Sequence, residues 1–246
     1  MKNLINNLSH IVEKSVLTLV TTKKDGIHKA TCFVVYQDDK SYLAICCRHS
    51  VERATNVEVR DASLRQIDAT VVYKDDRYDM AVLKIDKTDD RKFECLKFRN
   101  MNVQFGSDCF MIGCQSGKPN TISQGKIMEN LFYTTSDVKK METSTRGEKL
   151  REGWLLKNEG HYQFSVKKAI IVKGCGDTGN SGSPLLDNEL NLIGMVFEKA
   201  GVEIGETVMV ALSSEFLFES WSRFTKKSAV SPDQIMVDFS EKIKNI

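Results

Sequence analysis

The chain has 246 residues, enough for one large domain or two small ones that bury a core. Hydrophobic residues make up 41% of the sequence and aromatic residues 8%, which excludes a disordered or fibrous chain. Lys and Arg number 35 and Asp and Glu number 33, so the net charge of +2 does not point to nucleic acid or an anionic membrane as the main partner.

The first fifteen residues, MKNLINNLSHIVEKS, alternate apolar and polar side chains at helical spacing and predict a helix over 1–15. They lack the continuous apolar run of a signal peptide, and no segment approaches the roughly 18 apolar residues of a membrane span. The seven Cys are odd in number and scattered, which predicts reduced thiols rather than a disulfide framework. These features predict a cytoplasmic protein, in its own cell or in a host.

After this helix the pattern changes to short runs rich in Val, Ile, Thr and aromatic residues, separated by polar turns, which is typical of strands. Six such strands with no long helix between them predict a first antiparallel β-barrel over 16–90. The predicted strands cover 16–22, 30–37, 41–46, 56–60, 66–74 and 80–85.

A charged stretch over 86–91 is interpreted as the link to a second half, which is again rich in strands. We expect a second barrel over 91–212, with a polar surface excursion at 131–160, and a helical segment over 213–246 that includes a short helix after Pro232. The apolar residues of its first helix fall near one face. The predicted strands of this half cover 109–113, 121–128, 161–172, 184–197 and 206–212.

The most informative segment is GDTGNSGSP, from Gly176 to Pro184, which surrounds Ser181 with Gly residues in a β-rich region. Gly permits backbone dihedrals closed to other residues and lets a substrate approach the backbone. A nucleophilic Ser needs such a setting, with an exposed Oγ and backbone N–H groups aimed at a developing oxyanion. The alternative is a Gly-rich hairpin loop without chemistry, although the string GNSGSP is more specific than that interpretation requires.

GNSGSP resembles the nucleophile motif of trypsin-like serine peptidases, in the form seen in the high-temperature-requirement and glutamyl endopeptidase families. The resemblance implies an all-β fold with two six-stranded antiparallel barrels, a catalytic cleft between them, and helices at both ends. It also implies a His base and an Asp that precede the Ser in the chain, in that order. The segment MIGCQSGKPNTISQGKIM, over 111–128, resembles a further part of that family, and we expect its Gly residues to be structural.

Two segments fit the implied His and Asp. His49 lies in YLAICCRHSVE, which resembles the family's strand that ends in a His. Asp79 lies in RYDMAVLKI, which resembles its Asp at the start of an apolar strand; Asp75 and Asp76 are nearby alternatives that no strand follows directly. The resemblance then implies that Ser181 attacks the scissile carbonyl, that His49 transfers the proton, and that Asp79 holds the imidazole.

The backbone N–H groups of Gly179 and Ser181 are the implied oxyanion hole. Asn180 stands where digestive relatives carry an Asp that pairs with a newly cut N-terminus, so we predict activity without N-terminal cleavage. Activity that appears only after the N-terminus is trimmed would refute this. The adjacent pair Cys46 and Cys47 is interpreted as small buried hydrophobes, with redox control as the alternative.

Specificity follows from position relative to Ser181. Cys175 is expected at the floor of the main pocket, and Thr178 is expected among the residues that bind substrate. The stretch 195–199, with Val196, Phe197 and Lys199, is expected to pair with the substrate main chain. Lys199 or Lys173 could attract an acidic side chain; the residue preferred before the cut stays open, as does the oligomeric state.

The sequence therefore predicts a serine endopeptidase that works through an acyl-enzyme, with a polypeptide as partner and without metal or cofactor. No nucleic acid or membrane partner is expected. One alternative is a protease-like binding or scaffold module with weak or no catalysis. The other is a viral or effector peptidase that cuts a few defined sites.

Overall fold

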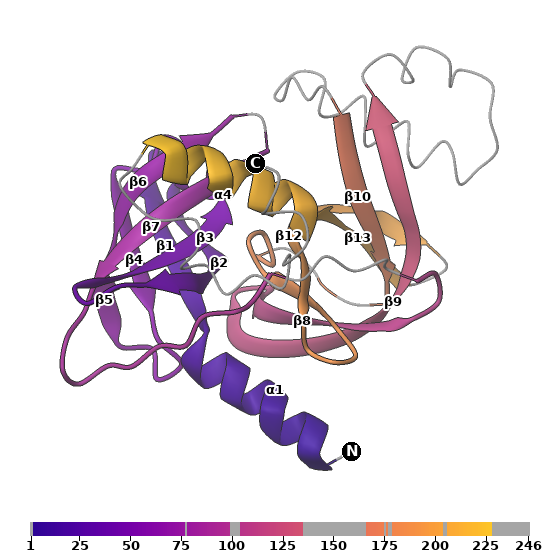
Figure 1. Cartoon of the computed structure of the whole chain (residues 1–246), viewed down its shortest axis with the longest axis horizontal. Helices are drawn as coiled ribbons and strands as arrows, with labels where there is room; N and C mark the ends of the chain where they lie inside the picture. Colours follow the sequence, from indigo (N-terminus) through magenta and orange to yellow (C-terminus); the bar gives the residue numbers. More distant parts are fainter. Residues whose placement is uncertain are drawn as a thin grey trace.

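The computed structural model describes residues 2–76, 78–98, 104–134, 166–174, 176, 179–203 and 206–227. Two β-structures lie side by side, the first built from the N-terminal half and the second from the C-terminal half (Figure 1). Helix α4 (Ser214–Lys227) lies across the upper part of the first sheet in this view, and helix α1 (Lys2–Lys14) projects below that sheet. The predicted fold class, an all-β double barrel with helices at both ends, is confirmed.

The first sheet has seven antiparallel strands in the order β5-β4-β1-β2-β3-β7-β6 and curls into a half-barrel. Its strands include the runs rich in Val, Ile, Thr and aromatic residues that predicted them, and the central ones are buried on both faces. The bounds are β1 (Val16–Lys23), β2 (Gly26–Gln37), β3 (Ser41–Cys47), β4 (Asn56–Arg60), β5 (Gln66–Asp68), β6 (Thr70–Asp75) and β7 (Met80–Asp86).

The strand predicted over 66–74 is two strands in the structure, because the chain changes its pairing partner there. Ile67 of β5 pairs with Val59 of β4, whereas Val71 of β6 pairs with Leu83 of β7. The break between β5 and β6 lets the chain pass from one edge of the sheet to the other. It accounts for seven strands where six were predicted.

The second β-structure is a closed barrel in the order β10-β13-β12-β11-β8-β9. Closure removes the exposed strand edges that an open sheet presents. The bounds are β8 (Asp108–Gln115), β9 (Lys118–Thr134), β10 (Val166–Lys173), β11 (Pro184–Asp187), β12 (Leu192–Glu203) and β13 (Glu206–Ser213).

The strand-rich run over 184–197 forms the hairpin of β11 and β12, which is what the resemblance to the peptidase family implied for it. Asp187 Oδ1 accepts hydrogen bonds from the backbone N–H groups of Glu189 and Asn191, both at 2.9 Å, and turns the chain. One prediction for this half needs correction. The first residues of the predicted excursion belong to β9, where Leu131 pairs with Ala169 of β10. The stretch 135–165, including the predicted strand residues 161–165, lies outside the described residues.

Three hydrophobic clusters stabilise this arrangement. One fills the first half-barrel around Leu19, Ala44 and Leu83, and another fills the closed barrel around Met111 and Ile193. The largest cluster lies between the two β-structures and includes residues of α1 and α4; among its members are Leu8, Phe33, Ile45, Met80, Ile112, Met195, Leu217 and Trp221. The two halves therefore share one core, which holds each half in a defined place relative to the other.

Three helices are described: α1 (Lys2–Lys14), the single-turn α2 (Arg48–Val51), and α4 (Ser214–Lys227). Leu217, Trp221 and Phe224 of α4 are buried on one face, as the helical spacing predicted. No helix among the described residues is long and apolar enough to cross a membrane. The helix predicted after Pro232 lies outside the described residues.

Candidate active site

His49 lies in α2, directly after the buried strand β3. The Arg48 N–H donates to the carbonyl oxygen of Asp79 at 2.8 Å, and Lys23 Nζ donates to the carbonyl oxygen of His49 at 2.8 Å. The Arg48 guanidinium pairs with Asp76 at 3.1 Å. A four-residue helix has few internal hydrogen bonds, and these external contacts satisfy polar groups that it leaves unpaired. They therefore hold α2, and with it the His49 side chain, in place.

Asp79 contacts His49 through both of its carboxylate oxygens. The His49 backbone N–H donates to Oδ1 at 2.9 Å, and the imidazole Nδ1 lies 2.6 Å from Oδ2. The Asp79 side chain is only 1% exposed, whereas that of His49 is 32% exposed. A buried carboxylate in this position fixes the orientation and the tautomer of the imidazole.

The two alternative carboxylates are engaged elsewhere. Asp75 accepts a hydrogen bond from Ser220 Oγ of α4 at 2.7 Å. Asp76 is largely exposed and pairs with Arg48. Of the three candidates, Asp79 is the one that the fold brings to His49.

Ser181 lies at the centre of a tight turn whose flanking Gly residues have left-handed backbone conformations, with φ of +91° at Gly179 and +86° at Gly182. A Cβ at Gly179 would overlap the carbonyl oxygen of Cys114, so only Gly fits there. The Gly182 N–H donates to the Val196 carbonyl oxygen at 2.7 Å, and the Val196 N–H donates to the Ser183 carbonyl oxygen at 2.9 Å. The turn is thus fixed to β12 on one side.

On its other side the turn is fixed to the first sheet by Thr31, a fully buried residue of β2. The Thr31 N–H donates to the Ser181 carbonyl oxygen at 2.9 Å. Its Oγ1 accepts from the Cys114 N–H at 2.9 Å and from Ser183 Oγ at 3.1 Å. A Thr within an apolar strand carries no sequence signal of such a role, so sequence reasoning missed it.

The turn also reaches the end of β3. A Cβ at Gly182 would lie 3.3 Å from the Cys47 backbone nitrogen, and Cys47 precedes His49 by two residues. Residues 179–183 of the second barrel therefore lie against the strand end from which His49 follows. The Ser181 Oγ donates a long hydrogen bond, 3.4 Å, to the Phe197 carbonyl oxygen.

Cys47 is a further residue of this site that the sequence marked only as a buried hydrophobe. Its thiol donates to the Val196 carbonyl oxygen at 3.3 Å. Burial, with the nearby charge of Asp79, raises the Cys47 pKa well above its usual value. The thiol is therefore neutral.

Cys47, His49 and Asp79 place one potential metal-ligand atom each within 4.8 Å of one another. The His49–Asp79 hydrogen bond already engages two of these groups, and the third is a protonated thiol. A metal would have to displace both protons, so the donor set does not form a ready metal site.

Three of the five residues predicted to set specificity, Val196, Phe197 and Lys199, lie in the described part of the chain. Cys175 and Thr178 lie outside the described residues. Both backbone polar groups of Val196 bond to the turn, and its side chain lies in the core of the second barrel. Phe197 is skipped in the pairing of β12 with β13, a bulge of the kind that re-aims backbone groups beside functional sites. Lys199 pairs with Met209 and is partly exposed, and its role in binding stays a prediction.

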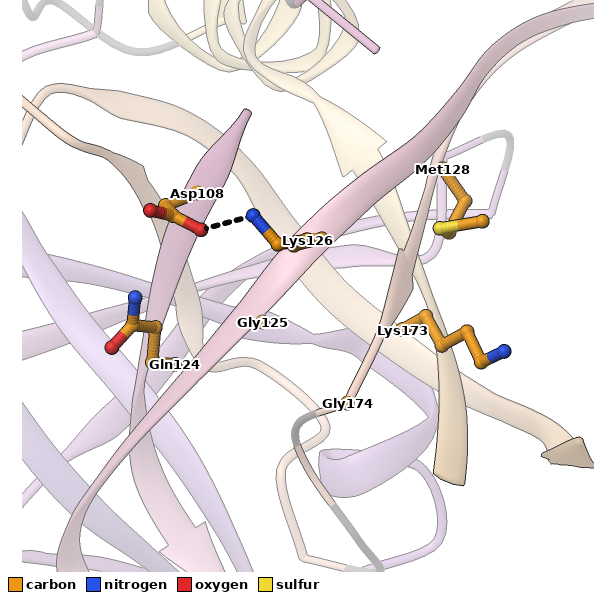
Figure 2. Close-up of a pocket in the computed structure, with 7 residues that line it drawn as sticks. All are labelled: Asp108, Gln124, Gly125, Lys126, Met128, Lys173 and Gly174. Carbon is orange, nitrogen blue, oxygen red and sulfur yellow. Dashed lines mark hydrogen bonds and ion pairs between the residues drawn. The ribbon is translucent and has the colours of Figure 1, made fainter. Parts of the chain in front are cut away.

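A pocket of about 510 Å³ opens beside β8, β9 and β10 (Figure 2). Lys173, which the sequence suggested for an acidic side chain, lines it, and Lys126 pairs across it with Asp108 at 2.9 Å. The full lining is Asp108, Gln124, Gly125, Lys126, Met128, Lys173 and Gly174. His49, Asp79 and Ser181 are not part of this lining.

Comparison with known proteins identifies the family. A model of the trypsin-like peptidase domain matches residues 30–195, more than half of the chain. The chain belongs to the trypsin-like peptidase domain family. The match includes the His49, Asp79 and Ser181 segments, and it confirms the resemblance that the motifs suggested. No curated protein sequence matches the chain significantly.

Solved structures share the fold of this trypsin-like peptidase domain. The active form of the Rv3671c protease from M. tuberculosis is 19% identical, with a TM-score of 0.66 over 89% of this chain and 85% of that one. The HtrA-type protease AlgW, solved with a tripeptide, is 21% identical, with a TM-score of 0.63 over 93% of this chain and 64% of that one. At such low identity these likenesses concern the fold alone.

Proposed function

We propose that this protein is a serine endopeptidase that cleaves peptide bonds through His49, Asp79 and Ser181. The observation that carries the proposal is the buried Asp79 carboxylate, which accepts from the imidazole Nδ1 at 2.6 Å and from the His49 N–H at 2.9 Å. A His held in this way can act as a general base through its other ring nitrogen, Nε2, which faces away from the carboxylate. Membership of the trypsin-like peptidase domain family supports the same conclusion.

In the proposed reaction Ser181 Oγ attacks the scissile carbonyl while His49 Nε2 takes its proton. For this the hydroxyl exchanges its long bond to the Phe197 carbonyl oxygen for one to His49, because 3.4 Å marks a weak interaction that a side-chain rotation can give up. His49 then returns the proton to the leaving amine, and water hydrolyses the acyl-enzyme by the same steps. Asp79 stabilises the imidazolium that forms in between.

The proposed oxyanion hole consists of the backbone N–H groups of Gly179 and Ser181. The N–H groups that follow in the turn are already used, since Gly182 donates to Val196 and Ser183 donates to Asn180 at 2.9 Å. The left-handed conformation of Gly179 and its close approach to Cys114 hold the first part of the turn rigid. Preorganised donors of this kind are worth about 3 kcal/mol each to the transition state.

The proposed substrate is an extended polypeptide that pairs with β12 beyond Val196. Val196 itself has both backbone polar groups occupied, so the pairing would involve the residues that follow the Phe197 bulge. A tripeptide is present in the AlgW structure, which has the same fold. The peptidase and the binding-module interpretations differ in whether Ser181 reacts.

A fluorophosphonate probe tests the proposal, because it forms a covalent bond with an activated serine hydroxyl. We expect it to label the wild-type chain and not Ser181→Ala, and we expect His49→Ala to reduce labelling by at least a hundredfold. Labelling is measured by intact-protein mass spectrometry and by the fluorescence of a tagged probe. Ser63→Ala, at an exposed position between β4 and β5, is a matched control for loss of one serine hydroxyl and should label normally.

Circular dichroism and the thermal midpoint establish that each variant is folded. If the folded wild-type protein is not labelled, the peptidase proposal is wrong and the binding-module interpretation is favoured. If His49→Ala is labelled at the wild-type rate, His49 is not the base.

A further inference from the structure

Tyr78, the residue before Asp79, is held by the C-terminal helix. The residue is 1% exposed, and its hydroxyl donates to Glu219 Oε2 at 2.6 Å. The ring packs on Phe216 with 5.2 Å between centroids, and the Arg223 guanidinium lies 4.8 Å from the ring centroid. Three residues on one face of α4 therefore fix this single tyrosine.

The same helix also contacts the other end of the connection between β6 and β7. Asp75, the last residue of β6, is 5% exposed and accepts from Ser220 Oγ at 2.7 Å. Arg223 pairs with Asp75 at 3.4 Å and with Glu219 at 2.6 Å. Arg223 thus links Asp75, at the start of the connection, to Glu219, which accepts the hydrogen bond from Tyr78.

The connection that α4 grips ends in Asp79, whose backbone is in the left-handed region at φ +50°. Such a conformation is sparsely populated for a residue other than Gly and persists only where its surroundings impose it. On its far side Asp79 is bound to α2 through the Arg48 N–H and His49. On the N-terminal side of Asp79, the neighbouring residue is the buried Tyr78, which contacts α4.

We infer that α4 is a brace that sets the position of Asp79, with Tyr78 and Glu219 as positioning residues. The inference rests on the proposed function, since it concerns how accurately the Asp79 carboxylate faces His49. Because α4 directly follows β13 of the second barrel, the brace ties the Asp79 segment of the first sheet to the half of the molecule that carries Ser181. Loosening it lets Asp79 turn away from His49 while the substrate surface stays intact.

The first test is Tyr78→Phe, which keeps the ring and removes the hydroxyl that donates to Glu219. We expect kcat to fall about tenfold with KM unchanged, because only the orientation of the base is affected. We also expect the low-field proton resonance of His49 Nδ1 to weaken and to move upfield, because its hydrogen bond to Asp79 lengthens. Tyr42→Phe is the matched control, since it removes a hydroxyl that donates to the Arg91 carbonyl oxygen at 3.4 Å, at the opposite end of β3 from His49; it should change neither quantity.

Glu219 provides a second pair of variants. Its side chain is 46% exposed, so substitution leaves the core intact. Glu219→Gln keeps an oxygen that accepts from Tyr78 and should retain most of the activity, whereas Glu219→Ala should match Tyr78→Phe. If Tyr78→Phe proves poorly folded, kcat and the Nδ1 resonance of the two Glu219 variants test the brace instead.

Unchanged kcat and an unchanged Nδ1 resonance in Glu219→Ala would overturn the brace, as would a rise in KM without a fall in kcat. The Nδ1 resonance is independent of hydrolysis. A protein that fails to react with the fluorophosphonate probe but loses the resonance in Glu219→Ala would therefore refute the peptidase proposal and leave the brace standing.

Discussion

Thr31 belongs to the first sheet, and its side chain forms hydrogen bonds with residues of the second barrel. Its Oγ1 accepts from Cys114 of β8 and from Ser183 of the turn, and its N–H donates to the Ser181 carbonyl oxygen. The Gly at position 113 leaves room for this contact, since a Cβ there would overlap both Ser183 Oγ and Thr31 Oγ1. Gly113 is therefore structural, as the sequence suggested for the glycines of its segment.

Thr31→Val should destabilise the protein by about 1–3 kcal/mol, because the isosteric side chain leaves the buried Cys114 N–H without an acceptor. Urea unfolding at constant pH measures the change. We also expect slower fluorophosphonate labelling, because the turn that carries Ser181 loses a support.

Thr31→Ser keeps the hydroxyl and is the control, with a loss confined to one buried methyl group. Equal losses of stability in the Val and Ser variants would mean that the hydroxyl contributes little.

At the scale of elements, the buried strand β3 leads directly into α2, which carries His49. Cys46 and Cys47 of β3 are fully buried, on opposite sides of the strand, and take part in different hydrophobic clusters. Burial raises the pKa of both thiols well above the usual value, with further contributions from the charge of Asp79. Among the described residues the cysteines are free thiols.

These raised pKa values predict a loss of stability at alkaline pH. An unfolded thiol ionises near pH 8.5, whereas the buried thiols stay protonated, so the unfolded state releases protons first. Their contribution is fully present below about pH 8.5. Above it the free energy of unfolding falls by up to about 1.4 kcal/mol per thiol for each pH unit.

Urea unfolding at pH 7.5 and at pH 9.5 measures this loss, and Cys47→Ala should show a smaller loss than the wild type. The comparison cancels the other groups that titrate in this range. A Cys47→Ala variant with the same alkaline loss would mean that the Cys47 thiol ionises in the folded state.

At the scale of the whole molecule, the two β-structures are held together by the largest hydrophobic cluster. Trp221 of α4 is fully buried within it and packs on Phe224 at 5.3 Å and on Tyr36 of β2 at 6.2 Å between ring centroids. His49 and Asp79 come from the first half and Ser181 from the second. The packing between the halves therefore sets where Ser181 lies relative to His49 and Asp79.

Trp221→Ala should cost about 3–5 kcal/mol of stability and should slow fluorophosphonate labelling of the protein that remains folded. Both are measured on the same preparation, by urea unfolding and by labelling below the unfolding transition. Ile67→Ala, in the core of the first half-barrel, is the control: it should destabilise without slowing labelling. Equal labelling rates in the two variants would show that packing between the halves does not affect Ser181.

The local pattern determined β4, which begins and ends where its run of strand-forming residues predicted, and the buried face of α4. It also determined the residue types of the candidate site, because Gly-flanked Ser181 and the strand-terminal His49 and Asp79 lie in recognisable motifs. The tertiary structure decided which of three nearby carboxylates contacts His49, where Thr31 and Tyr78 act, and where the chain changes partner between β5 and β6. The physical reason is distance along the chain. Thr31 and Ser181 are 150 residues apart and Tyr78 and Glu219 are 141 apart, so no local periodicity reflects contacts that only folding creates.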